Sequence, residues 1–241
     1  MSSDILAVSA DEESALAAAV AAIRNGEIIV LPTDTVYGIG AAVTNPEAVQ
    51  RLLDAKERGR DFPPPVLVAE VRSIGALVEG LDERVALLGE AFWPGALTLV
   101  LPAQPSLQLD LGDRAATIAV RVPDHRFTRE LLRRTGPLAV SSANIHGEAA
   151  ALTVADAMAQ LGDRVSVYLD AGTGAQPVPS TIVDLTGPHA RILRQGRIGP
   201  AALDAVVPGL IESEPEAGNG VAADLTASAA DESGIGSESG A

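Results

Sequence analysis

A run of four apolar residues, Ile28 to Leu31, constrains the fold of this chain more than any other segment. Consecutive apolar side chains bounded by a breaker are typical of a buried strand. Pro32 ends the strand because it has no N–H to donate. Asn45 and Pro46 then match the residue types preferred at the N-cap and the first position of a helix. The segment therefore predicts a buried strand, a loop and a helix in direct succession.

The loop between that strand and that helix is rich in short polar side chains. Thr33, Asp34 and Thr35 place three side-chain oxygens directly after the strand. Gly38 and Gly40 follow, at positions where the backbone can bend or be approached closely. The third glycine of a dinucleotide-binding fingerprint is missing, and the threonine loop separates these glycines from the strand. A dinucleotide site is therefore not indicated.

The rest of the chain interleaves short strands with helices. Apolar runs predict strands at 27–31, 66–71, 96–101, 117–122, 137–141, 165–169, 181–185 and 190–194. Capping and charge patterns predict helices from a capping box at Ser9 to Arg24 and at 46–57, 74–78, 83–92, 124–134 and 153–161. Because the spacing is less regular than in a doubly wound fold, we expect one α/β domain over residues 1–208, with a twisted mixed sheet and flanking helices.

The C-terminal segment 209–241 has a different composition. It consists mainly of Gly, Ser, Ala and acidic residues, which bury too little apolar surface to fold alone. We expect an acidic, disordered tail that the chemistry does not need.

Composition excludes several classes of site. The chain has no cysteine, so it has no disulfide framework, thiolate metal site or cysteine nucleophile. Its three histidines lack metal-ligand spacing, so no protein-bound metal is expected. A formal net charge of −15 opposes nonspecific nucleic-acid binding, and no apolar run reaches the length of a membrane span. We expect a cytoplasmic protein that does not associate with membranes.

The helix at 46–57 ends in a cluster of cations. Lys56 is the only lysine of the chain, and Arg58 and Arg60 follow it at alternate positions. Cations at a helix C-terminus commonly do no more than complement the helix dipole. Beside a threonine-rich loop, however, a compact ammonium and a planar guanidinium suit phosphate oxygens. We predict that Lys56 and Arg58 bind phosphate and take part in catalysis.

One strand carries a charge among apolar residues. Thr117 and Arg121 lie four apart in the strand at 117–122 and so share a face. A charge inside an apolar strand is costly unless it is paired. Either Arg121 forms a buried ion pair with an acid of the chain, or its guanidinium receives the carboxylate of a substrate.

Polar groups also follow other buried strands. Ser142 and Asn144 come directly after the strand at 137–141, where α/β sheets bind ligands, but without a nucleophile elbow. They either hydrogen-bond a ligand or form a plain turn. Ser180 and Thr181 begin another strand. Arg194 lies in the last one, where a surface position on an edge strand is the simpler alternative.

Taken together, these segments resemble the YrdC-like L-threonylcarbamoyladenylate synthases over about residues 10–200. The matching motifs are a P-T-x-T-x-Y-G-x-G loop from Pro32, K-x-R at Lys56, S-A-N at Ser142, S-T-I-V-D at Ser180 and L-R-x-G at Leu193. The chain departs from the family pattern at Phe62, Leu67 and Ala150, where members carry Asn, His and Ser. The resemblance implies a single YrdC-like domain with an open, curved sheet and a positively lined cleft.

The resemblance also implies a reaction and a set of roles. Members join L-threonine, bicarbonate or CO2, and ATP into threonylcarbamoyl-AMP and pyrophosphate, with Mg2+ held mainly by the triphosphate. The implied ATP-binding residues are Lys56, Arg58, Thr117, Ser142, Asn144 and Arg194. The implied threonine-binding residues are Thr33, Thr35, Arg121, Ser180 and Thr181. The expected class is a nucleotidyltransferase.

The resemblance further implies a place in tRNA modification. The adenylate supplies the threonylcarbamoyl group of the tRNA adenosine next to the anticodon. Expected partners are therefore downstream threonylcarbamoyl-transfer proteins, with tRNA bound weakly or indirectly. Two alternatives stay open: an RNA-binding module of the same fold, and a carbamoyl-adenylate-forming relative of the kind used in hydrogenase maturation.

Overall fold

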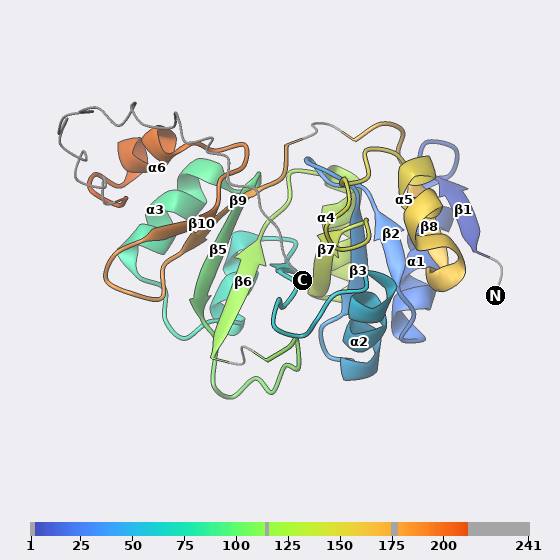
Figure 1. Ribbon diagram of the computed structural model, residues 1–241, viewed down its shortest axis with the longest axis horizontal. Helices are drawn as coiled ribbons and strands as arrows, with labels where there is room; N and C mark the ends of the chain where they lie inside the picture. The colour runs from blue at the N-terminus through green and yellow to red at the C-terminus, as the bar shows by residue number, and fades with distance from the viewer. Residues whose placement is uncertain (1–2, 114–115, 175–177, 212–241) are drawn as a thin grey trace, which may run out of the picture.

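The structure is a computed structural model that describes residues 3–113, 116–174 and 178–211 (Figure 1). The expected disordered tail lies outside the described residues from 212 onward. The strands are β1 (Asp4–Ala7), β2 (Ile29–Leu31), β3 (Gly38–Ala42), β4 (Val66–Leu67), β5 (Leu97–Pro102), β6 (Thr117–Arg121), β7 (Leu138–Ser142), β8 (Val167–Asp170), β9 (Thr181–Asp184) and β10 (Arg191–Arg194). The helices are α1 (Glu12–Arg24), α2 (Pro46–Ala55), α3 (Glu83–Phe92), α4 (Arg126–Thr135), α5 (Val154–Leu161) and α6 (Pro200–Val206), with 3-10 helices η1 (Val71–Ala76) and η2 (Gly162–Arg164).

The described strands form one twisted sheet in the order β1-β8-β2-β3-β7-β4-β6-β5-β9-β10. β1, β2, β4 and β5 each have a parallel neighbour, whereas β3, β7 and β10 pair only in antiparallel fashion. The predicted mixed α/β sheet with flanking helices is confirmed. β4 has only two residues and joins β7 to β6, so it links two halves of the sheet that lie side by side in Figure 1.

Helices cover the two halves differently. On the half formed by β1, β8, β2, β3 and β7, α1 and α4 pack on one face and α2 and α5 on the other. On the half formed by β6, β5, β9 and β10, α3 and α6 pack on one face, where Leu97, Leu99 and Val120 point. Because side chains alternate along a strand, Thr98 and Ala119 point to the opposite face, which these helices leave uncovered.

Two predicted helix N-caps are confirmed. Asn45 caps α2 through the N–H of Ala48, with Pro46 at the first turn. Thr153 caps α5 in a reciprocal capping box with Asp156. Among the described residues, no helix combines the length and apolarity that crossing a bilayer requires.

Other local predictions were wrong. Asp11, not Ser9, caps α1, because the carboxylate of Asp11 accepts the N–H of Ser14. Residues 38–42 form strand β3, although their glycines suggested a bend. Their small size is what the sheet requires, since a Cβ on Gly38 would lie 2.6 Å from Val140 Cγ1 and one on Gly40 2.9 Å from Leu31 Cδ2. β1 and α6 were not predicted.

The described chain continues past the expected domain boundary at residue 208. Leu210 is buried in the same core as α3 and α6, and Ile211 pairs with Ala190. A truncation that keeps this packing therefore begins after Ile211.

Candidate functional site

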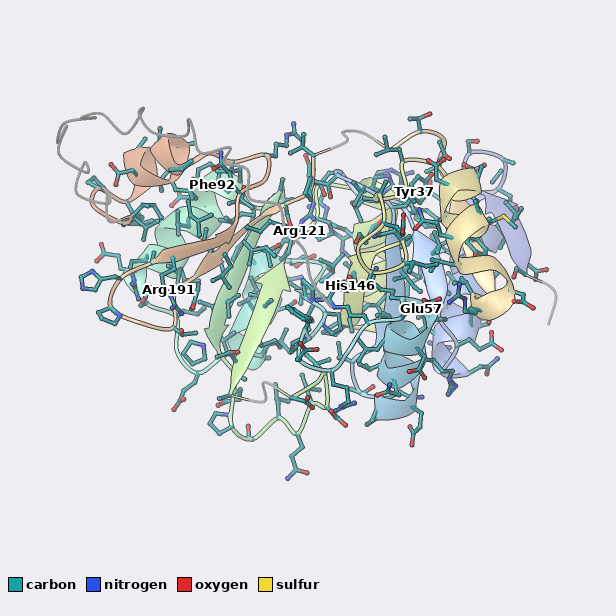
Figure 2. The ribbon with its side chains drawn as sticks, viewed as in Figure 1. Tyr37, Glu57, Phe92, Arg121, His146 and Arg191 are labelled. Atoms are coloured by element: carbon teal, nitrogen blue, oxygen red, sulfur yellow. The ribbon has the colours of Figure 1, made fainter. Side chains whose placement is uncertain are left out.

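A cavity of about 380 Å³ lies where the two halves of the sheet meet. Figure 2 shows Arg121 at this junction. The floor is the uncovered face of β5, β6 and β9, and the rim is formed by the threonine loop, the segment after α2, the end of β7 and β10. Its polar and charged lining residues are Thr33, Thr35, Tyr37, Arg58, Asp61, Thr98, Thr117, Arg121, Ser141, Ser142, Ser180 and Arg194.

The cavity concentrates positive charge in a protein that is acidic overall. Arg58, Arg121 and Arg194 line it, against the single carboxylate of Asp61. Burial lowers the pKa of all three guanidinium groups, and for Arg194 the nearby charges of Arg121 and Arg58 lower the pKa further. Cations that are partly stripped of water and repel one another favour an anionic ligand.

The end of α2 delivers Arg58 to this cavity. The N–H of Arg58 bonds Leu53 O at 3.0 Å and that of Glu57 bonds Asp54 O at 3.0 Å, the two bonds of a Schellman turn. Glu57 therefore has a φ of 53°, in the left-handed region. The guanidinium of Arg58 donates to Ser141 Oγ at 3.0 Å and lies 5.7 Å from the centre of the Phe62 ring. Its buried Nε has no hydrogen-bond partner among the described residues.

Lys56 lies beneath the cavity rim and does not line the cavity. It is 1% exposed, and its Nζ donates to the main-chain carbonyls of Ser142 and Asn144. Burial, and then the charge of Arg58, lower the pKa of Lys56 to about 7. Lys56 thus holds the loop that follows β7.

The side chain of Asn144 forms hydrogen bonds within the same loop. Its amide nitrogen donates to the carbonyls of Ile145 and Glu148, each at 2.8 Å. It does not line the cavity, and its buried Oδ1 has no partner among the described residues.

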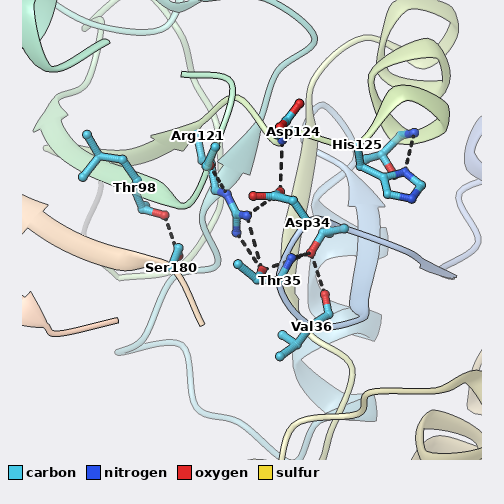
Figure 3. A network of polar contacts seen from close by, with 12 residues as sticks. Asp34, Thr35, Val36, Thr98, Arg121, Asp124, His125 and Ser180 are labelled. Carbon is cyan, nitrogen blue, oxygen red and sulfur yellow. Dashed lines mark hydrogen bonds and ion pairs between the residues drawn. The ribbon is translucent and has the colours of Figure 1, made fainter. Parts of the chain in front are cut away.

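The structure shows the first of the two alternatives considered for Arg121, the buried ion pair. Its Nη2 donates to Asp34 Oδ1 at 2.6 Å, so it forms a buried ion pair (Figure 3). Its Nε donates to Gly95 O at 2.9 Å, and both terminal nitrogens contact Thr35 Oγ1, at 3.2 and 3.3 Å. Arg121 nevertheless lines the cavity, on the same face of β6 as Thr117.

Ser180, which directly precedes β9, bonds two other residues of the cavity lining, Thr98 and Arg194. Its hydroxyl contacts Thr98 Oγ1 at 2.9 Å, and its carbonyl accepts Nε and Nη2 of Arg194, at 3.1 and 2.9 Å. Thr181 does not line the cavity; its hydroxyl donates to Ile198 O and accepts the N–H groups of Gly196 and Ile198.

The structure thus sorts the residues predicted from sequence into two groups. Those that line the cavity are Thr33, Thr35, Arg58, Thr117, Arg121, Ser142, Ser180 and Arg194. Those that bond neighbouring backbone outside the cavity lining are Lys56, Asn144 and Thr181. Sequence reasoning missed Thr98 and Ser141. Both are polar residues inside otherwise apolar strands, the same signal that identified Arg121.

The α/β fold thus places an arginine-lined cavity at the junction of a mixed sheet, and such a cavity suits small anionic ligands. The family is identified by comparison with known proteins. The Sua5/YciO/YrdC family model, described as telomere recombination, matches residues 21–196. The chain belongs to this family.

Relatives and solved structures agree with that assignment. A putative threonylcarbamoyl-AMP synthase of Mycobacterium tuberculosis (strain ATCC 25618 / H37Rv) is 50% identical over 192 residues, 80% of this chain and 88% of that protein. The threonylcarbamoyl-AMP synthase of Bacillus subtilis (strain 168) is 34% identical over 194 residues, 80% of this chain and 56% of that protein. The structure of P. abyssi Sua5 complexed with L-threonine matches with a TM-score of 0.79 and 29% identity, over 88% of this chain and 62% of that one.

Proposed function

We propose that this protein is an L-threonylcarbamoyladenylate synthase, a nucleotidyltransferase that converts L-threonine, bicarbonate or CO2, and ATP into threonylcarbamoyl-AMP and pyrophosphate. The observation that carries the proposal is the convergence of Arg58, Arg121 and Arg194 on one cavity. The substrates bear a carboxylate and a triphosphate, so a site with several buried guanidinium groups suits both. The names of the relatives support the same reaction.

The chemistry requires little from side chains beyond placement and charge. The ammonium group of threonine loses one proton, the resulting amine adds to CO2 through a new N–C bond, and the nitrogen loses a second proton to give a carbamate. A carbamate oxygen then attacks the α-phosphorus of ATP in line, the bond to the bridging oxygen of the β-phosphate breaks, and pyrophosphate leaves. Negative charge develops on phosphate oxygens, where guanidinium groups stabilise it. Binding the three reactants next to one another, in the right orientation, lowers the activation free energy further.

The roles of individual residues follow from their positions. Arg121 receives the threonine carboxylate, with Thr33, Thr35 and Ser180 around it. The nucleotide lies against Arg58, Arg194, Thr117 and Ser142. Three further predicted residues act from outside the cavity lining, by shaping the loops: Lys56, Asn144 and Thr181.

Magnesium enters as part of the Mg-ATP substrate. Among the described residues, no group of three or more His, Cys, Asp or Glu side chains is arranged to hold a metal. The triphosphate is therefore the principal ligand of the ion in this proposal.

The product has a defined use in this proposal. Threonylcarbamoyl-AMP passes to transfer proteins that modify the tRNA adenosine next to the anticodon, in the cytoplasm, with tRNA bound weakly or indirectly. The catalytic domain, expected to span residues 1–208, extends in this proposal to Ile211, which still packs on its core, and the acidic tail beyond Ile211 is dispensable. A chain ending at Ile211 is then expected to keep full activity.

The test is pyrophosphate release from Mg-ATP, with threonine or bicarbonate omitted in turn. We expect release that requires both, and its loss in Arg58→Ala. Release that needs neither substrate would contradict the proposal, as would a lack of release from a folded wild-type protein. Arg72→Ala is a suitable control, because Arg72 is an exposed arginine whose partner, Glu70, also pairs with Arg133.

A further inference from the structure

The polar loop after β2 contains a hydrogen-bond chain whose direction is fixed. Thr33 Oγ1 lies 2.6 Å from Val36 O and can only donate to it. Since a hydroxyl has one proton, the 3.1 Å contact between Thr33 and Thr35 hydroxyls must be donated by Thr35. Thr35 Oγ1 then has only lone pairs left, and these face Nη1 and Nη2 of Arg121. The Thr35 hydroxyl thus accepts from Arg121, and neither threonine hydroxyl has a proton left for a ligand.

Arg121 has one N–H group without an acceptor among the described residues. A guanidinium has five N–H hydrogens. Gly95 O takes that of Nε, Asp34 and Thr35 take the two of Nη2, and Thr35 takes one of Nη1. Among the described residues, one Nη1 hydrogen has no acceptor. Arg121 is 6% exposed and lines the cavity, so this hydrogen is the one that can meet a substrate carboxylate.

Asp34 is the charged member of this arrangement. Its Oδ1 accepts Nη2 of Arg121 at 2.6 Å and the main-chain N–H of Asp124 at 3.0 Å. It thereby joins the threonine loop to the segment that follows β6. Asp34 is 6% exposed and does not line the cavity, whereas Thr33, Thr35 and Arg121 do. Asp34 therefore affects the cavity only indirectly, by holding the side chain of Arg121.

We propose that Asp34 is a positioning residue for substrate recognition: it fixes the guanidinium of Arg121 so that its one free N–H faces the amino-acid substrate. The carboxylate role of Arg121 rests on the proposed function, but the fixing of Arg121 does not. A hydrogen bond between charged groups, once lost, allows a long side chain to sample other rotamers. The consequence is a specific loss of affinity for the amino acid, not for the nucleotide.

Kinetics test the consequence. In Asp34→Ala we expect the KM for L-threonine to rise about 10–100-fold, the range of a lost charge-assisted hydrogen bond. The KM for ATP stays unchanged. L-Threoninamide lacks the carboxylate. The ratio of kcat/KM for L-threonine to kcat/KM for L-threoninamide is therefore expected to fall in this variant. Asp34→Asn keeps an acceptor oxygen for Arg121 and Asp124 and is expected to give an intermediate KM; it carries the test if Asp34→Ala does not fold.

A matched control separates positioning from general damage. Asp184 is also a carboxylate, 7% exposed, that pairs with an arginine, Arg191, at 2.6 Å, but Arg191, unlike Arg121, does not line the cavity. Asp184→Asn is expected to leave both KM values unchanged. If the KM values for threonine and ATP rise together in the Asp34 variants, Asp34 supports the fold only and the proposal is wrong.

A direct readout of Arg121 is independent of activity. In ¹H–¹⁵N spectra of the full chain, Arg121 Nε–H, assigned with Arg121→Lys, should give a slowly exchanging signal because Nε is bonded to Gly95 O. We expect that signal to broaden or exchange rapidly in Asp34→Ala but not in Asp184→Asn. An unchanged signal would overturn the positioning role. Absence of threonine-dependent pyrophosphate release in the wild type would instead overturn the proposed function, and the spectra would still decide the fixing of Arg121.

Discussion

Two buried cations support this site from opposite sides, and they are stabilised in different ways. Arg121 is 6% exposed and pairs with the carboxylate of Asp34. Lys56 is 1% exposed and donates to neutral carbonyls, those of Ser142 and Asn144. Among the described residues, Lys56 has no ion pair, and the charge that most affects it is the like charge of Arg58.

The difference determines how each cation responds to pH. A buried charge with a counter-charge keeps its proton, while one that meets only dipoles titrates more easily. The pKa of Lys56 falls to about 7, within the physiological range. Arg121 stays charged and its position depends on Asp34. One wall of the site is thus held by a fixed ion pair, and the other by a group whose charge changes near neutrality.

The largest effect is expected from breaking the ion pair. Arg121→Ala leaves the carboxylate of Asp34 buried without its cation, which typically costs about 3–5 kcal/mol in the free energy of unfolding. Urea denaturation measures the loss. Threonine-dependent pyrophosphate release should be lost as well, under conditions where the variant is folded.

The matched control for that loss is Arg191→Ala. Arg191 pairs with Asp184, but its side chain is 72% exposed and Asp184 also accepts the N–H and hydroxyl of Thr186. The expected loss is below about 1 kcal/mol. If Arg121→Ala and Arg191→Ala lost the same free energy of unfolding, burial of the Asp34–Arg121 pair would add nothing to its contribution to stability.

A smaller effect is expected from removing the lysine. Lys56→Met keeps the length of the side chain but leaves two main-chain carbonyls without their donor. At about pH 8 we expect a loss of about 1–3 kcal/mol in the free energy of unfolding, the cost of unsatisfied buried polar groups. Pyrophosphate release should also fall, because the loop that carries Ser142 loses its anchor. An unaltered stability would show that these bonds contribute nothing.

The pH dependence of the Lys56 contribution has a definite sign. Because the folded pKa of about 7 lies below the ordinary value of 10.5, the unfolded chain binds more protons between these values. Stability of the wild type relative to Lys56→Met should therefore rise with pH from about 7 to 10, by at most about 1.4 kcal/mol per unit. Urea denaturation of both proteins across this range measures it. A flat or falling difference would contradict a lowered pKa.

Much of the fold was predictable because local signals agreed with it. Asn45 and Thr153 cap helices as their residue types suggest. Strand β3 was missed because Gly38 and Gly40 have low strand propensity and are needed for close contact with β7 and β2, which only the assembled sheet reveals. The short edge strand β1 depends on β8, far along the chain, for its pairing.

The site shows the same division between local and nonlocal information. Arg121 was identifiable because a charge in an apolar strand demands an explanation. Its partner was not identifiable, since Asp34 is 87 residues away and the chain offers many acids. Lys56 was singled out as the only lysine, but its sequence position does not reveal that Nζ turns beneath the loop after β7 while Arg58 enters the cavity. That separation depends on the backbone at Glu57.

The smallest effect is expected at Glu57 itself, which lies between the two cations of α2. Its φ of 53° is unfavourable for a residue with a Cβ by about 1 kcal/mol, and glycine removes that cost. Its side chain contributes little, because the contact with Arg164 is 3.2 Å long and solvent-exposed. Glu57→Gly should therefore be more stable than Glu57→Ala by about 1 kcal/mol in urea denaturation, with pyrophosphate release retained in both. Suppose instead that Glu57→Ala and Glu57→Gly have the same free energy of unfolding. The left-handed backbone at residue 57 would then not be what directs Lys56 beneath the loop and Arg58 into the cavity.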